Sequence, residues 1–293
     1  GWAADKESYW MPVDLYVGGA EHAVLHLLYA RFWHHVLHDL GHVSTREPFQ
    51  KLFNQGMILG EDGSKMSKSR GNVINPDEVI DEYGADSMRL YEMFMGPLDK
   101  AKPWQTKGLQ GCSRFINKLW NKVCSSDGLS ENITSDTAES ETIKLKHQTI
   151  KKVSDDIENL RFNTAISQMM IFTNHLTTLK SINREILQTF AQLLAPFIPH
   201  TAEEIWQRLG NDNSITYEQW PDYDEELAKE NIISIAIQVN GKLRANIEID
   251  INTEEDDVLQ LAKENDRINN YIGGKELIKE IYVPGRLINF VVK

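Results

Sequence analysis

The chain has 293 residues and a formal net charge of −12, with 41% hydrophobic and 25% charged residues. This length allows two or three domains, and the composition is typical of a soluble globular protein. No apolar run suggests a membrane span, and the acidic balance argues against indiscriminate nucleic-acid binding. The N-terminus has no secretion-signal pattern, and Cys112 and Cys124 form no zinc pair or disulfide framework. We therefore expect a cytoplasmic protein.

The first segment predicts a strand, a long helix and a second strand. Residues 13–17 read as a short buried strand, residues 21–40 as a helix, and residues 52–59 as another strand. This order indicates a βαβ unit with parallel strands. Because ligands bind beyond the carboxyl ends of such strands, we expect the turn GGAEH (18–22) and the loop GSKMSKS (63–69) to face one crevice.

A helical region follows. Asn75 is a good N-cap for a helix that ends at Gly84. The pattern from about 106 to 210 is almost wholly helical, apart from a polar loop at 125–141. We expect Thr201 to cap the last of these helices.

The C-terminal region predicts a small mixed module. From Ile232 apolar and polar residues alternate, and Asn240-Gly241 is a strong hairpin signal. A helix is expected from about Glu254, and a Pro-Gly turn then separates two more short strands. This pattern predicts a compact ββαββ arrangement.

The predicted fold class is therefore multidomain. We expect a partial α/β Rossmann-type half at 1–100, an α-helical bundle at 101–225 and a small α+β domain at 226–293.

The stretch GEDGSKMSKSRGN (60–72) places two lysines and an arginine within six residues. It is not a Walker phosphate loop, because Gly60 and Gly63 are three apart and Ser64 precedes the lysine. Two ammonium groups on a mobile loop can close over a polyphosphate when charge builds on the leaving oxygens. The alternative is a solvated charged turn.

The residues 65–69, KMSKS, resemble the second signature of class I aminoacyl-tRNA synthetases. Residues 9–37 resemble the segment that precedes this signature in bacterial leucyl-tRNA synthetases. Residues 193–210 resemble the helical anticodon-binding-type domain of that family, and 239–249 and 281–292 resemble its small C-terminal domain. The resemblance covers essentially the whole chain in the same order.

This resemblance assigns roles to residues. It implies two catalytic ammonium groups at the β- and γ-phosphates of ATP, Lys65 and Lys68. It implies an ATP-binding set, Gly18, Gly19, Glu21, Met66, Ser67 and Ser69. In that set Glu21 accepts hydrogen bonds from ribose hydroxyls. His22 is similar to the histidine that lines the leucine side-chain pocket, although a structural role is the alternative.

The resemblance also implies tRNA contacts in the C-terminal domain. The candidate residues for these contacts are Lys242, Arg244, Lys275, Lys279 and Arg286. The alternative is a structural cap with scattered surface charge. We expect ATP with Mg²⁺ as substrate and no metal site in the chain itself, although several histidines share one predicted helix.

The pattern departs from the family in two ways. No HIGH-like first signature occurs, and the small domain that many bacterial members insert before the lysine loop is absent. We therefore expect a C-terminal portion of a leucyl-tRNA synthetase, inactive without an N-terminal half that carries the first signature and the editing domain. Its expected partners are tRNA(Leu), leucine, ATP and that half, and no membrane. Two alternatives remain: a synthetase for valine, isoleucine or methionine, and a non-catalytic tRNA-binding remnant.

Overall fold

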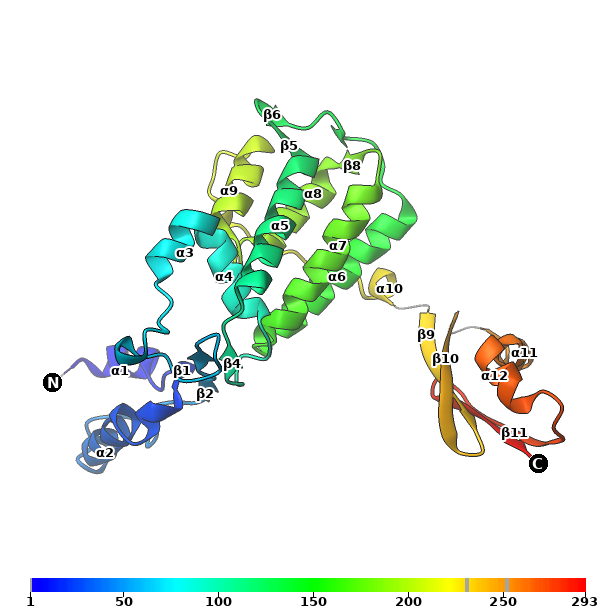
Figure 1. Ribbon diagram of the computed structural model, residues 1–293. Helices are drawn as coiled ribbons and strands as arrows, with labels where there is room; N and C mark the ends of the chain where they lie inside the picture. The colour runs from blue at the N-terminus through cyan, green and yellow to red at the C-terminus, as the bar shows by residue number, and fades with distance from the viewer. Residues whose placement is uncertain (1, 230–231, 251–252) are drawn as a thin grey trace. The chain divides into compact units, whose positions relative to one another are not determined.

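The computed structural model describes residues 2–229, 232–250 and 253–293 (Figure 1). They fall into two compact units, Gly1–Tyr223 and Asp224–Lys293. Each unit has its own apolar core. The domain boundaries after residues 100 and 225 stay predictions.

The first unit contains a small parallel pair of strands. β1 (Tyr16–Gly19) pairs in parallel with β2 (Leu52–Gln55), and α2 (His26–Asp39) lies between them in the chain. A 3₁₀ turn, Ala20–Ala23, stands where the predicted helix was expected to begin. Leu25 separates the two, because its φ of −111° and ψ of −101° are not helical. The predicted strand–helix–strand order and the parallel pairing are confirmed. The prediction of a buried strand over residues 13–17 is wrong, because the strand lies at Tyr16–Gly19 and half of the Val17 surface is exposed.

The prediction of one strand over residues 52–59 is wrong. The chain turns away from β1 at Gly56, and β3 (Ile58–Leu59) pairs in parallel with β4 (Lys102–Pro103) instead. Gly56 allows this turn because a side chain there would overlap the backbone carbonyl of Lys100. The GGAEH turn and the lysine loop therefore follow strands of two different sheets. They do not lie at the edge of one sheet, as was expected.

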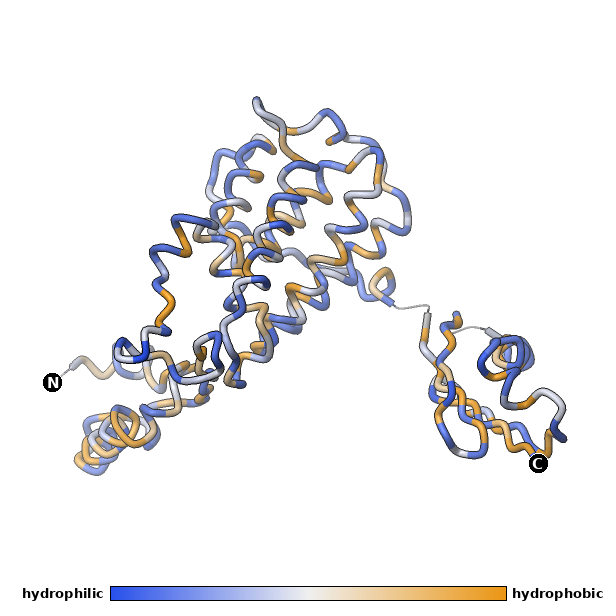
Figure 2. The backbone as a smooth tube through the Cα atoms, in the orientation of Figure 1, coloured by the Kyte–Doolittle hydropathy of each residue, from blue (hydrophilic) through white to orange (hydrophobic). Residues whose placement is uncertain are grey.

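Helices build most of the first unit around one apolar core (Figure 1). In Figure 2 apolar and polar segments alternate along them, as expected where one helix face is buried. The core runs from Leu90 to Ile215 and includes the rings of Phe172 and Phe190, which meet edge to face at 5.0 Å. The main helices are α3 (Pro76–Tyr83), α4 (Ala85–Phe94), α5 (Thr106–Val123), α6 (Ser140–Glu158), α7 (Phe162–Thr178), α8 (Arg184–Leu194) and α9 (Pro199–Arg208).

Shorter elements complete this unit. The N-terminal helix α1 spans Ala4–Trp10 and carries no buried side chain. Two strand pairs edge the helices: β5 (Cys124–Ser125) with β6 (Gly128–Leu129), and β7 (Ile133–Thr134) with β8 (Ile182–Asn183).

The helix ends test the capping predictions. α3 begins after Asn75, whose Oδ1 accepts the amide of Asp77 at 3.2 Å, and ends at Gly84 with φ of 85°, as predicted. The cap at Thr201 is wrong, because α9 begins at Pro199. Asp86 of α4 caps α9 from outside.

Asp86 takes this role because it is buried against the start of α9, with 8% of its surface exposed. Its Oδ2 accepts the amide and the hydroxyl of Thr201 at 2.7 and 2.6 Å. Its Oδ1 lies 2.9 Å from Nδ1 of His200. A carboxylate from a distant helix thus satisfies donors that the local sequence pattern assigned to Thr201.

The second unit is a four-stranded sheet with two helices. The sheet order is β10-β9-β12-β11, with β12 parallel to β9 and the other pairs antiparallel. Asn240 and Gly241 have φ of 50° and 77°, which suits the predicted two-residue hairpin. The predicted single helix is in fact two. The elements are β9 (Ile232–Val239), β10 (Lys242–Asp250), α11 (Glu255–Glu264), α12 (Asp266–Ile272), β11 (Leu277–Val283) and β12 (Leu287–Val292), preceded by α10 (Glu225–Ala228).

A buried carboxylate joins α6 to α7. Asp156 accepts Nζ of Lys152 at 2.6 Å, Nε of Arg161 at 2.8 Å and Oγ1 of Thr164 at 2.6 Å. Burial opposes the ionisation of Asp156, but these hydrogen bonds outweigh it and hold its pKa below the ordinary value. Because the folded pKa is lowered, the ionised carboxylate stabilises the fold at neutral pH, and this contribution is lost as the pH falls through that pKa.

Replacing Asp156 by Asn should therefore destabilise the first unit in a pH-dependent way. We expect Asp156→Asn to lower the free energy of unfolding at neutral pH by about 2 kcal/mol, typical of lost hydrogen bonds to a charged group. The difference from wild type should shrink below about pH 4. Urea unfolding followed by circular dichroism measures both effects, and Asp155→Asn at the exposed neighbouring position is the control. A wild-type stability for Asp156→Asn would contradict this account.

Candidate functional site

The GGAEH turn places an acid directly over a glycine backbone. Glu21 lies in the 3₁₀ turn after β1, and its carboxylate folds back onto Gly19. A side chain at Gly19 would overlap that carboxylate, so glycine is what permits this position. Glu21 is exposed and makes no hydrogen bond to any described residue, so its oxygens are open to an incoming hydroxyl donor.

His22 belongs to a row of rings beside this turn. It is exposed, and its ring lies 6.3 Å from that of His26 in an edge-to-face arrangement. His26 in turn stacks with Tyr16 at 5.5 Å, and Tyr16 lies 4.6 Å from Phe49. The row connects β1 and α2 to the segment before β2.

The lysine loop begins as a tight hairpin and ends as a 3₁₀ turn. Leu59 pairs with Lys65 in antiparallel fashion, and the amide of Gly60 donates to the carbonyl of Ser64 at 2.9 Å. The 3₁₀ turn spans Lys68–Arg70. Lys65 and Lys68 are both exposed, and neither makes an ion pair with a described residue. Both ammonium groups are therefore available to an anion from outside.

Two anchors hold this loop to the helices, and sequence reasoning missed both. The half-buried side chain of Met66 packs against the apolar core of the first unit. Glu61 accepts the hydroxyl of Thr106 at 2.7 Å and its amide at 3.4 Å, at the first residue of α5. Glu61 thus caps α5 from outside, which only the tertiary structure can reveal.

The second acid of the loop, Asp62, accepts hydrogen bonds from uncharged groups. Oδ1 of Asp62 accepts the amide of Ser64 at 3.0 Å, and Oδ2 accepts its hydroxyl at 2.7 Å. The Ser64 hydroxyl, then its amide and the Asn72 side chain, lower the pKa of Asp62. Ser67 and Ser69 face each other, with 3.2 Å between their hydroxyl oxygens. These contacts shape the loop without neutralising its lysines.

The basic residues predicted for tRNA lie on the second unit. The guanidinium of Arg244 stacks over Tyr271 at 4.2 Å from the ring centre, which holds it in place. The other four are exposed: Lys242, Lys275, Lys279 and Arg286.

The histidines of α2 have separate partners. Nε2 of His34 lies 2.8 Å from the carbonyl of Thr45, and Nε2 of His35 lies 3.3 Å from Glu47. Within the described parts of the chain, no group of three or more His, Cys, Asp or Glu residues is placed to hold a metal ion. The helices described here also include none that is long and apolar enough to cross a membrane.

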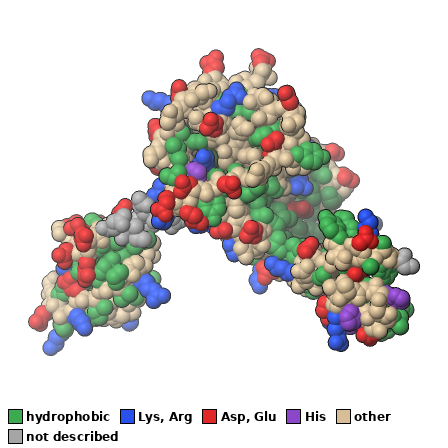
Figure 3. Space-filling model, turned by 180° about the vertical axis from the view of Figure 1, so that it is seen from behind, with side chains coloured by type: hydrophobic (Ala, Val, Ile, Leu, Met, Phe, Trp, Pro, Cys, Tyr) green, Lys and Arg blue, Asp and Glu red, His purple; other side chains and the backbone are tan. Residues whose placement is uncertain are grey.

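α2 presents an apolar stripe to the surface. Four exposed apolar side chains of α2 follow the spacing of one helix face: Leu28, Tyr29, Phe32 and Trp33. The exposed Leu25 directly precedes the helix. In Figure 3 hydrophobic side chains lie on the surface of the region that holds α2. An exposed apolar face of this kind is typical of an interaction surface.

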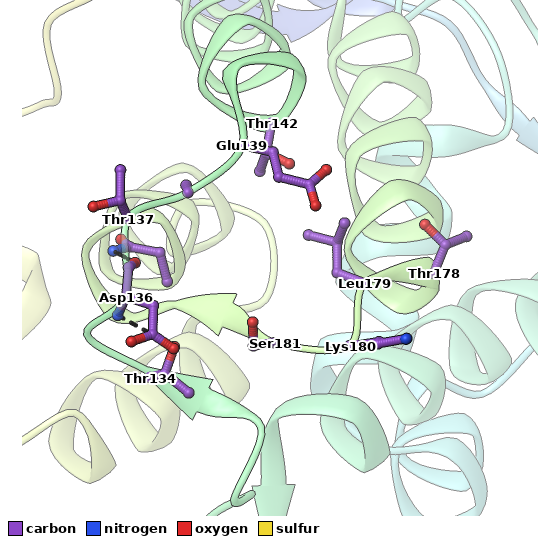
Figure 4. A pocket seen from close by; sticks show the side chains of 11 residues that line it. Thr134, Asp136, Thr137, Glu139, Thr142, Thr178, Leu179, Lys180 and Ser181 are labelled. Carbon is purple, nitrogen blue, oxygen red and sulfur yellow. Dashed lines mark hydrogen bonds between the residues drawn. The ribbon is translucent and has the colours of Figure 1, made fainter.

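A cavity of about 460 Å³ lies apart from these residues, between the loop before α6 and the end of α7 (Figure 4). In Figure 4 Thr134, at the end of β7, lies beside Asp136 of that loop, and the amide of Asp136 donates to Oγ1 of Thr134 at 3.3 Å. None of the residues predicted to bind ATP or leucine lines the cavity.

Two family models match the chain. The model of "tRNA synthetases class I (I, L, M and V)" matches residues 3–104, which include the GGAEH turn and the lysine loop. The model of "Anticodon-binding domain of tRNA ligase" matches residues 141–260. These matches define the chain as a class I tRNA synthetase polypeptide.

The relatives that match the chain are leucine–tRNA ligases. The chain is 54% identical over 98% of its length to a leucine–tRNA ligase of Chlorobaculum parvum and 54% identical over 99% to one of Chloroherpeton thalassium. A ternary complex of Agrobacterium radiobacter K84 agnB2 LeuRS, tRNA and LeuAMS matches with a TM-score of 0.71 and 34% identity, over 96% of this chain and 38% of that one. The chain belongs to the leucine–tRNA ligase family and matches the C-terminal part of its members. It spans 36% of the length of these two ligases.

Two lysines near the loop should differ sharply in their effect on stability. Lys102 is buried, and its Nζ donates to the carbonyl of Gly96 at 3.0 Å, whereas Lys68 is exposed. We expect Lys102→Ala to lower the free energy of unfolding by about 1–2 kcal/mol. Lys68→Ala should change it by less than about 0.5 kcal/mol. Urea titrations of the two variants provide the comparison, and a destabilised Lys68→Ala would give Lys68 a structural role.

Proposed function

We propose that this chain supplies part of the active site and part of the tRNA surface of a leucine–tRNA ligase. The complete enzyme would join leucine to ATP with release of pyrophosphate and then transfer leucyl to tRNA(Leu). The observation that carries the proposal is the anchored lysine loop, in a chain of this family. Its hairpin presents Lys65 and its 3₁₀ turn presents Lys68, and neither ammonium group makes an ion pair with a described residue.

In this proposal Lys65 and Lys68 contact the β- and γ-phosphates of ATP. Negative charge grows on the pyrophosphate as it leaves, and two cations placed there stabilise the transition state more than the ground state. Mg²⁺ arrives with ATP and is held by its phosphates. Met66, Ser67 and Ser69 line the nucleotide through the backbone and hydroxyls of the loop.

The GGAEH turn supplies the other half of nucleotide binding. The open carboxylate of Glu21 accepts the ribose hydroxyls, and Gly18 and Gly19 allow the backbone to come close. His22, exposed beside this turn, lines the leucine side chain.

The second unit contacts tRNA in this proposal. The five basic residues predicted for tRNA bind phosphates and sugars and so read backbone shape rather than base sequence. Arg244, held over Tyr271, provides the most rigid of these contacts.

The partner of the α2 stripe is, in this proposal, the part of the enzyme that precedes the matched region in the relatives. That part would cover the stripe and bring the remaining phosphate-binding residues, so this chain alone would not activate leucine.

Removing the Lys68 ammonium should slow activation. We expect Lys68→Ala to reduce leucine-dependent ATP–pyrophosphate exchange about 10²- to 10³-fold in the complemented enzyme, the range for losing one donor to developing charge. Lys107→Ala, at an exposed position in the first turn of α5, is the matched control and should stay active. Unchanged exchange in Lys68→Ala would exclude the proposed role of Lys68.

A charge on the α2 stripe should prevent complementation. We expect Phe32→Glu to weaken association with the N-terminal part at least tenfold, because it places a carboxylate in an apolar interface. Ile171→Glu is the matched control, since Ile171 is an exposed apolar residue of α7, with 53% exposure against 59% for Phe32. Analytical ultracentrifugation of the mixed parts measures the affinity, and equal binding by both variants would mean that the stripe has another partner.

A further inference from the structure

Asn72 connects the two arms of the lysine loop. Its Nδ2 donates to Oγ of Ser64 at 3.0 Å and lies 3.3 Å from Oδ1 of Asp62 and 3.4 Å from the carbonyl of Lys65. Its Oδ1 accepts the amide of Ser67 at 2.9 Å. One half-buried side chain therefore contacts both the hairpin that carries Lys65 and the segment that carries Lys68.

An amide is the chemical group that this position requires. The contacts on the hairpin side need a donor, and the amide of Ser67 needs an acceptor. A carboxylate at 72 would keep the acceptor but would place a second negative charge against Asp62. Gly60 leaves room for the contact, because a side chain there would press on both Nδ2 of Asn72 and Oδ1 of Asp62.

We propose that Asn72, held by Asp62, is a positioning residue that fixes Lys65 and Lys68 relative to each other. The ammonium groups lie on different arms of the loop, and their separation is set by the contacts that join the arms. Glu61 anchors the loop to α5 through Thr106 and takes no part in this latch between Asn72 and Asp62. The effect on rate rests on the proposed function, whereas the latch itself can be tested without activity.

Tryptic cleavage of this chain tests the latch directly, because trypsin cuts after Lys65, Lys68 and Arg70. We expect Asn72→Ala to speed cleavage at these bonds about tenfold, as local opening becomes easier, with other sites unchanged. Asn72→Asp should also speed it. The exchanged pair Asp62→Asn with Asn72→Asp should return close to the wild-type rate, because it restores one amide facing one carboxylate.

Glu61→Gln is the matched control, since it alters an anchor of the same loop outside the latch and should leave the arms joined. Wild-type cleavage rates in both single Asn72 variants would overturn the latch. If Asn72→Asp is cleaved quickly and the exchanged pair is cleaved just as quickly, the pairing of Asn72 with Asp62 is overturned.

The positioning role is tested by exchange kinetics in the complemented enzyme. We expect Asn72→Ala to lower kcat about tenfold with little change in KM for ATP, and the exchanged pair to recover kcat. If Asn72→Ala opens the loop but keeps full kcat in an enzyme that Lys68→Ala disables, the positioning role is overturned. If Lys68→Ala has no effect, the proposed function fails, and the cleavage rates still decide the latch.

Discussion

Lys65 and Lys68 make no ion pair with any described residue, in a chain with a net charge of −12, and the lysine loop is built around this constraint. Asp62 of the loop accepts hydrogen bonds from Ser64 and Asn72, so the loop is shaped by hydrogen bonds and not by ion pairs with its own lysines. Neutralising Lys65 or Lys68 internally would stabilise the loop but would remove the charge that a polyphosphate can use. The anchors at Met66 and Glu61 tie this arrangement to the bundle.

These anchors attach the lysine loop to the helical bundle. Glu61 meets the first residue of α5, and β3 pairs with β4 directly before that helix. Asp86 of α4 caps α9 in the same way, from outside. In the first unit, carboxylates thus accept hydrogen bonds from the N-termini of helices that lie far from them in the sequence.

The sequence predicted a structural feature correctly where the interacting residues are close together in the chain. Asn75 and Gly84 bound α3 as predicted, and Asn240-Gly241 forms the expected hairpin. The break at Gly56 was not predictable, because its cause is the approach of Lys100 from elsewhere in the chain. Asn72 carried no sequence signal beyond its place after the lysines, since its importance lies in contacts across the loop.

The exposed apolar face of α2 also bears on the proposed function. The α2 stripe is exposed in this chain, and the chain spans 36% of the relatives described above. In the function proposed above, the apolar face of α2 and the nucleotide-binding residues of the GGAEH turn would meet the same complementing part of the enzyme.

The most direct test is leucine-dependent ATP–pyrophosphate exchange, measured with this chain alone and after mixing with the N-terminal part of a leucine–tRNA ligase. The account predicts no exchange from the chain alone and exchange specific for leucine in the mixture. Two parts that associate, bind tRNA and still show no exchange would contradict it and favour a tRNA-binding remnant.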